Sequence, residues 1–444
     1  MTFTGSELSA LWALPFAGLL ASLAIWPLIT ASFWHRHYGK ITAAWTLAFV
    51  VPFAALFGMS EALHQLVHAL LLEYVPFVIV LFALYTIAGG IAVRGTLVGT
   101  PALNTGLLAV GAALASAMGT TGAAMLLIRP LLRANEKRRQ QVHVVVFFII
   151  LVGNVGGALT PLGDPPLFIG FLNGVDFFWT TRALALPTLV LAGALLAIFH
   201  ALDSWLWRRE PAAPLTAYEP LAIDGAQNFA LIAGVVGAVL LSGLWNPGIV
   251  FDVLGTPLAM QNVVRDGALA ALAVASLALT PRGLRASNGF SWVPIVEVAK
   301  LFAGIFFTII PLLAMLQAGR DGALAGVVSL VTDSATGEPR QAMYFWMTGL
   351  LSALLDNAPT YLVFFNLAGG DAATLMGAAG TTLASISAGA VYFGALTYLG
   401  NAPNFMIRAI AEDRGVAMPG FFAYLGWASL VLLPLLAVTT WLFL

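Results

Sequence analysis

The chain contains no cysteine and very little charge. Of its 444 residues none is Cys and only 9% are charged, whereas an ordinary soluble domain is about a quarter charged. The absence of cysteine excludes disulfides, thiolate metal ligands and thiol nucleophiles. The shortage of charge argues against a water-exposed surface of the usual kind, and a net charge of -1 gives no reason to expect a nucleic-acid partner.

Apolar residues make up 60% of the sequence instead. Apolar stretches recur from end to end, each about long enough to cross the ~30 Å hydrocarbon core of a bilayer. No basic region or cleavage site precedes the first of them, so we expect no removable signal peptide. The ten expected spans lie near residues 10–30, 41–58, 69–93, 144–178, 183–205, 228–246, 267–281, 296–318, 381–412 and 419–442. The sequence therefore predicts an all-α polytopic membrane protein.

Two further apolar stretches, 100–132 and 341–369, are each too short for two spans. Their centres are polar or contain Gly and Pro, and read Gly119-Thr120-Thr121-Gly122 and Asp356-Asn357-Ala358-Pro359-Thr360. Irregular backbone survives at membrane depth only when it is buried in protein or lines a wet cavity. We therefore expect both stretches to be re-entrant hairpins.

The distribution of positive charge predicts the orientation of the chain. Short cytoplasmic loops carry most Lys and Arg, and with the N-terminus outside, 13 of the 19 Lys and Arg fall in the inner loops and four outside. The first hairpin then enters from the cytoplasm and the second from outside. We expect a multi-pass protein of the bacterial inner membrane with both termini in the periplasm.

An internal repeat supports this arrangement. Residues 157–168 align with residues 394–405 at an offset of 237, and eight of the twelve positions are identical, including Thr, Gly and Pro. Each half then holds five spans and a hairpin, so the second half is inverted, as in many secondary transporters. The expected parts are a first repeat over 1–205 with a broken helix at 144–178, a cytoplasmic linker over 206–226, and a second repeat over 227–444 with a broken helix at 381–412.

The repeated motif must interrupt its helices. The segment Gly163-Asp164-Pro165-Pro166 cannot remain helical, because Pro lacks the backbone donor and clashes with the preceding turn. The same holds at Gly400-Asn401-Ala402-Pro403. A break exposes the carbonyls of one half-helix and the N–H groups of the next, which can bind a cation or an anion. We expect the two breaks and the two hairpin tips to meet near the midplane and to form the transport site.

Two acidic residues stand out at that depth, Asp164 and Asp356. Charge inside a membrane is costly and therefore indicates function, here the binding of a cation or a proton. The alternative is that each carboxylate merely caps the half-helix that follows. The neutral candidate ligands are Asn154, Thr160, Asn357, Thr360, Thr397, Asn401 and Asn404, with Ser116, Thr120 and Thr121 at the first tip. Ordinary hydrogen bonds between helices remain the alternative for each.

Arg129 is a candidate charge partner inside the first hairpin. It could neutralise Asp164, attract an anionic substrate, or extend to the inner surface. Of the six His residues, His143 and His200 lie close to span ends, and they do not form the i, i+4 pair that could bind a metal. We therefore expect no metal cofactor. No phosphate-binding glycine loop is present, so ATP is not the expected energy source. The coupling ion is expected to be Na⁺ or H⁺.

At these residues the chain resembles the ion transporter superfamily, which groups arsenite permeases, D-type sodium/proton antiporters and citrate or dicarboxylate carriers. Residues 154–164 are similar to the G-G-x-x-[ST]-P-[IL]-G-D segment of the D-type antiporters, and Leu355-Asp356-Asn357-Ala358-Pro359 is similar to their L-D-N-x-P segment. The chain also resembles a citrate-transporter-like branch. The resemblance implies a substrate site between hairpin tips and broken helices, a homodimer, and an elevator-like motion.

Two departures weigh on the substrate. The D-type antiporters carry an acidic residue at the tip of the first hairpin, whereas the tip of this chain is Gly119-Thr120-Thr121-Gly122. The carboxylate carriers carry an S-N-T sequence at their hairpin tips, which neither hairpin of this chain has. The leading hypothesis is sodium/proton antiport, and the alternative is ion-coupled transport of citrate, a dicarboxylate or an arsenite-type anion. A membrane aspartyl protease would also need two aspartates, but Pro161 and Leu355 replace the residues of its motifs, so we expect no enzyme. A passive channel also fits a polar midplane.

Overall fold

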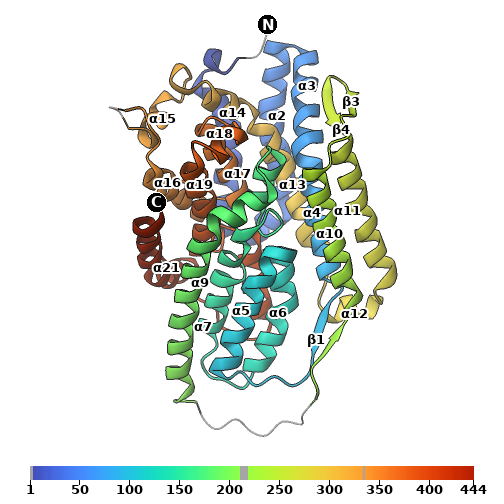
Figure 1. Ribbon diagram of the computed structural model, residues 1–444, viewed down its shortest axis with the longest axis vertical. Helices are drawn as coiled ribbons and strands as arrows, with labels where there is room; N and C mark the ends of the chain where they lie inside the picture. The colour runs from blue at the N-terminus through green and yellow to red at the C-terminus, as the bar shows by residue number, and fades with distance from the viewer. Residues whose placement is uncertain (1–3, 211–218, 334–335) are drawn as a thin grey trace.

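The computed structural model in Figure 1 describes residues 4–210, 219–333 and 336–444. Within these ranges, nine helices are long and apolar enough to cross a membrane, or ten when one bent pair is counted as a span. Strands among the described residues are confined to two short antiparallel pairs. The prediction of an all-α polytopic membrane protein is confirmed.

The first helices form the blue part of Figure 1, and the second and third of the expected spans begin earlier in the sequence than predicted. After the turns η1 (Gly5–Glu7) and η2 (Ala10–Ala13), the helices are α1 (Leu14–Ile29), α2 (Ala31–Phe57), α3 (Met59–Ala69), the π-helical turn η3 (Leu70–Tyr74) and α4 (Val75–Ala88). The predicted spans at 41–58 and 69–93 therefore start about ten residues too late. No proline lies between 31 and 51, so the polar residues Arg36 and Lys40 continue the helix instead of forming a loop.

The first hairpin and the first broken segment follow. Their elements are α5 (Pro101–Met118), α6 (Thr120–Asn135), α7 (Val142–Leu151), η4 (Val155–Leu159), α8 (Pro165–Leu172) and α9 (Phe177–Trp207). The hairpin turns at Gly119, whose φ of +80° favours glycine. Of the segment Val142–Leu159, 89% is buried inside the protein, whereas the other candidate spans are at most one-third buried. The broken helix is thus a central element, surrounded by helices that also face lipid.

The region between the two halves contains a strand that the sequence did not predict. Strand β2 (Ala222–Asp224), inside the predicted linker 206–226, pairs with β1 (Ala92–Arg94). Residues 211–218 of that linker lie outside the described residues. The helices α10 (Gln227–Leu244) and α11 (Met260–Leu279) follow, with the strand pair β3 (Val250–Val253) and β4 (Thr256–Ala259) between them.

The predicted span 296–318 is bent in the structure. After α12 (Arg282–Ser287), helix α13 (Val293–Thr308) meets α14 (Ile310–Gln317) at an angle of 43°. Pro311 explains the bend, because it has no N–H to donate to the preceding turn and its ring clashes there. The chain then enters η5 (Gly319–Asp321) and α15 (Ala325–Val331).

The second hairpin and second broken segment complete the fold. Their elements are α16 (Gln341–Leu354), α17 (Asn357–Leu367), α18 (Ala372–Met376), α19 (Gly380–Phe393), η6 (Gly394–Leu396) and α20 (Ala402–Asp413), followed by α21 (Phe421–Phe443). In Figure 1 the first hairpin (α5 and α6) occupies the lower half of the molecule, whereas α16 and α17 lie in the upper half. The two hairpins therefore approach the centre from opposite ends.

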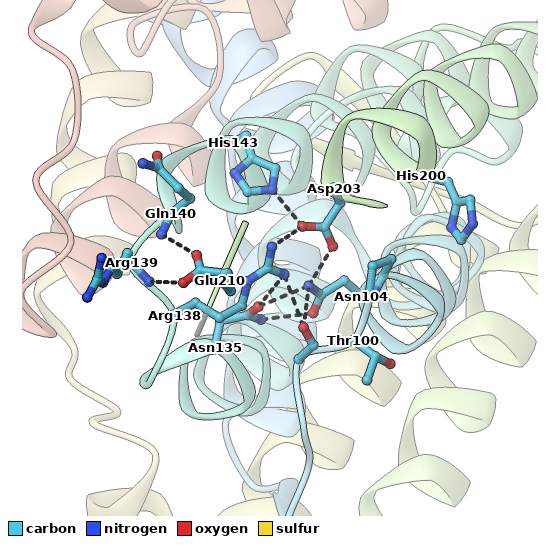
Figure 2. A network of polar contacts seen from close by, with 12 residues as sticks. Thr100, Asn104, Asn135, Arg138, Arg139, Gln140, His143, His200, Asp203 and Glu210 are labelled. Carbon is cyan, nitrogen blue, oxygen red and sulfur yellow. Dashed lines mark hydrogen bonds and ion pairs between the residues drawn. The ribbon is translucent and has the colours of Figure 1, made fainter. Parts of the chain in front are cut away.

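A buried polar network fixes the base of the first hairpin to α9 (Figure 2). The carboxylate of Asp203 accepts hydrogen bonds from Arg138, from His143 Nε2 at 2.8 Å and from Asn104 Nδ2 at 2.9 Å. Asn135 joins it through reciprocal amide bonds with Asn104. The Asp203 side chain is fully buried and that of Arg138 is 4% exposed, so this ion pair is part of the protein interior.

Candidate functional site

Both copies of the repeated motif break their helices, as predicted. In the first copy, backbone after η4 is extended at Thr160, and α8 starts only at Pro165. In the second, backbone after η6 is extended at Thr397, and α20 starts at Ala402. Each break therefore presents the N-terminus of a half-helix to the centre of the protein.

Equivalent contacts hold the two breaks in place. The hydroxyl of Thr160 donates to the Ser116 carbonyl at 2.5 Å, and that of Thr397 donates to the Ala353 carbonyl at 2.5 Å. Each bond ties a break to the neighbouring hairpin. Both threonines were candidate ligands, but their hydroxyls are used by the backbone, which favours the structural alternative.

The glycines of the motif allow the backbone to fold onto itself. A Cβ added to Gly163 would lie 2.1 Å from the carbonyl oxygen of Gly157, and one added to Gly400 would lie 2.6 Å from that of Gly394. Real Cβ atoms do not approach backbone oxygen so closely. The identical glycines of the two copies thus have a packing requirement.

Asp164 brings all four interrupted segments together. One of its carboxylate oxygens accepts from Thr120 Oγ1 at 3.2 Å and from Asn401 Nδ2 at 2.8 Å, and the other accepts from Asn357 Nδ2 at 2.6 Å. These partners come from the first hairpin tip, the second break and the second hairpin tip. Asp164 is 1% exposed and its side chain makes no cap bond to α8. The capping alternative therefore does not apply to this residue.

Asp356 behaves differently. Its carboxylate accepts from the Ala358 N–H at 3.0 Å and so caps α17, as the alternative proposed. Its backbone carbonyl accepts from the hydroxyl of Thr360 at 3.0 Å. Asp356 nevertheless lines the central cavity and is close enough to Asp164 for their charges to repel. It can therefore cap the helix and still present negative charge to the site.

Three asparagines, Asn154, Asn401 and Asn404, connect the two breaks through hydrogen bonds. Asn154 donates to Asn404 Oδ1 at 2.8 Å and accepts from Asn401 at 3.3 Å. Asn404 in turn donates to the carbonyls of Gly394 and Thr397, both at 2.8 Å. Asn154 and Asn404 are fully buried and do not line the cavity. Among the three, only Asn401 faces the site directly.

A central cavity adjoins the Asp164 carboxylate and encloses about 860 Å³ of empty space, counting its mouth. Its polar wall holds five of the predicted site residues: Thr120, Thr121, Asp164, Asp356 and Asn401. The opposite wall is apolar and comes from α4 and α13, including Phe77, Leu84 and Phe302. The sequence did not identify this second wall, because its residues look like ordinary lipid-facing or core positions of two distant spans.

Four helix N-termini converge on the polar wall. They are the starts of α6 at Thr120, α8 at Pro165, α17 after Asp356 and α20 at Ala402. Each helix N-terminus carries roughly half a positive charge, which attracts anions. Unpaired N–H groups can add to this attraction, but not at the first two positions of α8, where Pro165 and Pro166 have none. Among the cavity-lining residues that the structure describes there is no Lys, Arg or His, so the helix ends supply the positive field.

Arg129 is not brought to Asp164. It lies nine residues beyond Thr120 on α6, about 13 Å along the axis, and its guanidinium packs against Gly289, where an added Cβ would lie 2.4 Å from Nη2. Its Nη1 atom is buried and has no hydrogen-bond partner among the described residues. The structure places the guanidinium on the α12–α13 side of α6, outside the cavity lining.

Comparison with known proteins identifies the family. No curated protein matches the chain. A family described as "Putative citrate transport" matches residues 5–444, nearly the full length. The resemblance to the citrate branch is thereby supported, whereas the closer similarity to sodium/proton antiporters is not. The chain belongs to this citrate transport family of the ion transporter superfamily, and it is a membrane transporter.

Proposed function

We propose that the protein carries a small organic anion with two or three carboxylates, of the citrate kind, and that Na⁺ or H⁺ binding at Asp164 drives the transport. The observation that carries this proposal is the convergence of four helix N-termini on one cavity. Helix N-termini attract carboxylates through their dipoles and through any free N–H groups, and do not need basic side chains. The family match agrees with an anionic substrate of this class.

The charge balance of the site supplies a mechanism for coupling. Four N-termini contribute roughly +2 in total at about +0.5 each, and Asp164 with Asp356 contributes -2 when both are ionised. The empty site is therefore close to neutral and attracts an anion weakly. A cation or proton at Asp164 would make the site positive, so substrate and coupling ion bind together.

The surroundings of Asp164 are suited to a bound ion. Asn357 is fully buried beside it, and the Oδ1 atom of Asn357 has no hydrogen-bond partner among the described residues. A buried acceptor without a donor costs free energy, which a sodium ion between this oxygen and the carboxylate would recover. With a proton instead, the protonated Asp164 could donate to the same oxygen.

We also propose that residues 1–205 and 227–444 are inverted repeats. The equivalent contacts of Thr160 and Thr397 and the opposite approach of the two hairpins support this division. The periplasmic termini, the homodimer and the bacterial inner membrane remain predictions from charge distribution and family resemblance.

Sodium/proton antiport is the competing function, and one observation favours it. Two carboxylates line one cavity whose described lining has no basic side chain, an arrangement in which a sodium ion and protons could compete. In that case the cavity would hold no organic anion during the cycle.

A panel of flux measurements on purified protein in vesicles separates these functions. We expect labelled citrate or a dicarboxylate to accumulate when an inward sodium or proton gradient is imposed, and labelled arsenite not to. Collapse of an imposed pH gradient by sodium alone, with no accumulation of any carboxylate, would establish antiport and refute the proposal. Protein-free vesicles and the Gly163→Ala variant serve as controls.

A further inference from the structure

A second cavity opens at the end of the molecule that holds the N-terminus (Figure 1), the side that the positive-inside rule assigns to the periplasm. It encloses about 1290 Å³ counting its open mouth. Thr4, Ser6 and Asp321 lie at its exposed part, and Gln65, His68 and Glu73 line it along α3 and η3. Unlike the central cavity, this crevice has polar side chains on several walls.

Glu73 is the unusual residue of this crevice. It sits in the π-helical turn Leu70–Tyr74, in the middle of the 30-residue apolar span Met59–Ala88. Its side chain is partly buried, and within the described part of the chain no cation or hydrogen-bond donor pairs with it. An unpaired carboxylate at that depth is costly, and π-helical turns occur frequently at functional sites.

The crevice and the central cavity share one face of the same span. Gln65, Ala69 and Glu73 line the crevice at intervals of four residues. The next position in this series is Phe77, which lines the central cavity, as do Val80, Leu81 and Leu84 farther along. Residues at this spacing lie above one another on a helix. Glu73 is thus the last polar group before the central site.

An aromatic cluster separates the two spaces. The ring of Phe77 stacks on Phe302 with centroids 4.5 Å apart and meets Phe306 edge-on at 5.5 Å. Phe77 is fully buried. Tyr74 joins the cluster edge-on to Phe306 at 6.4 Å, and its hydroxyl is bonded to the Ala299 carbonyl at 3.0 Å. In the series of positions 73, 77, 81 and 84 no polar side chain follows Glu73, which makes this face a barrier to ions.

We propose that Glu73 is a proton-binding site at the inner end of an outer half-channel, closed from the transport site by Phe77 and its aromatic partners. A proton entering from the crevice neutralises the carboxylate and removes the cost of its burial. The proposal adds a proton route to the proposed transport function, but its labelling test does not depend on the solute that is carried.

The charged neighbours of Glu73 are few. His68 of α3 and Asp321 of η5 line the same crevice, and both are exposed.

Glu61 of α3 is bonded to Gln65, and His64 faces the turn between β3 and β4. Glu297 and Lys300 of α13 face α2, near Trp34 and over Tyr38, and Arg320 of η5 points toward Gly337. The elements α8 and β4, which contact η3, and α14, which lines the crevice, carry no titratable side chain.

Carbodiimide labelling tests the site directly, because the reagent modifies protonated carboxyl groups in apolar surroundings. The purified full-length protein is treated with dicyclohexylcarbodiimide at pH 6, 7 and 8, and the modified peptides are identified by mass spectrometry. We expect Glu73 to be modified, with several-fold less modification at pH 8 than at pH 6, and Glu61 on the same helix to remain unmodified. No modification of Glu73 at any pH would overturn the proposal.

The same experiment distinguishes a proton from a sodium ion. At constant pH, replacing choline chloride with sodium chloride should leave the modification of Glu73 unchanged. Protection by sodium would show that the crevice holds that cation, and would refute a proton site.

A leak measurement tests the aromatic barrier. Vesicles containing Phe77→Ala should lose an imposed pH gradient several-fold faster than the parent without any substrate, and Glu73→Gln added to Phe77→Ala should restore retention. Phe49→Ala, which truncates an equally buried aromatic in α2, controls for packing loss. A Phe77→Ala leak that persists in the double variant would remove Glu73 from the route.

Discussion

Replacing Asp203 with asparagine should destabilise the protein strongly while leaving the transport site untouched. The Asp203 carboxylate is fully buried and neutralises Arg138, whose side chain is 4% exposed. Asparagine preserves the shape but removes the charge, so the Arg138 guanidinium stays buried without a counter-ion. It also weakens the bonds from His143 and Asn104, because one neutral amide oxygen replaces the two carboxylate oxygens that accept them.

The expected loss can be estimated from these contacts. Breaking a buried ion pair by removing one partner costs about 3–5 kcal/mol, because the remaining charge is uncompensated. The matched control is Glu412→Gln, which removes a solvent-accessible i, i+4 pair with Arg408 and should cost only about 0.3–0.5 kcal/mol. The free energy of unfolding should therefore fall about ten times more in Asp203→Asn than in Glu412→Gln.

Equilibrium unfolding of the purified protein in mixed detergent micelles measures both variants. A second test is the double variant Asp203→Asn with Arg138→Met, which removes both charges and should recover part of the loss. If Asp203→Asn costs less than about 1 kcal/mol, or if the double variant is as unstable as the sum of both changes, the buried charge is not what stabilises the hairpin base.

Three further substitutions test the central site. Gly163→Ala should abolish accumulation of labelled citrate, because its Cβ would lie 2.1 Å from a backbone oxygen, whereas Gly237→Ala in α10, which meets no atom within 4 Å, should match the parent. Asn401→Ala removes a 2.8 Å bond to Asp164. A hydrogen bond to a charged group contributes about 1.5–3 kcal/mol, so the coupling-ion concentration for half-maximal uptake should change at least tenfold, and an unchanged value would contradict the role of Asp164. Thr397→Val should lower the unfolding free energy by about 1–3 kcal/mol, and Thr397→Ser should not.

The breaks and hairpins could be predicted from the sequence because their causes are local. Pro165 and Pro403 disfavour a continuing helix, and next to Gly163 and Gly400 they stand where one ends and another begins, although Pro130 and Pro187 are accommodated inside α6 and α9. Gly119 permits a turn that other residues resist. The internal repeat then indicated that the interrupted segments belong together. The convergence at Asp164 of Thr120 and Asn357 with the second break follows that expectation.

The errors concern helix ends and distant pairs. The early starts of α2 and α3 were missed because polar residues near a bilayer surface do not end a helix. The ion pair of Arg138 with Asp203 joins residues 65 positions apart, and no local pattern marks such a pair. Glu73 could have been noticed as a lone acidic residue in an apolar span, but its crevice depends on contacts with η1, α14 and η5 that only the fold reveals.

The most direct test of the central claim is equilibrium binding of labelled citrate to the purified protein, with and without the coupling ion. The parent should bind citrate only when Na⁺ or low pH neutralises Asp164. The Asp164→Asn variant, in which the Asn357 amide can turn to accept the new N–H, should bind citrate in choline chloride at neutral pH. Ion-independent binding by the parent, or loss of binding under all conditions by a folded Asp164→Asn protein, would contradict the balance between helix dipoles and carboxylates.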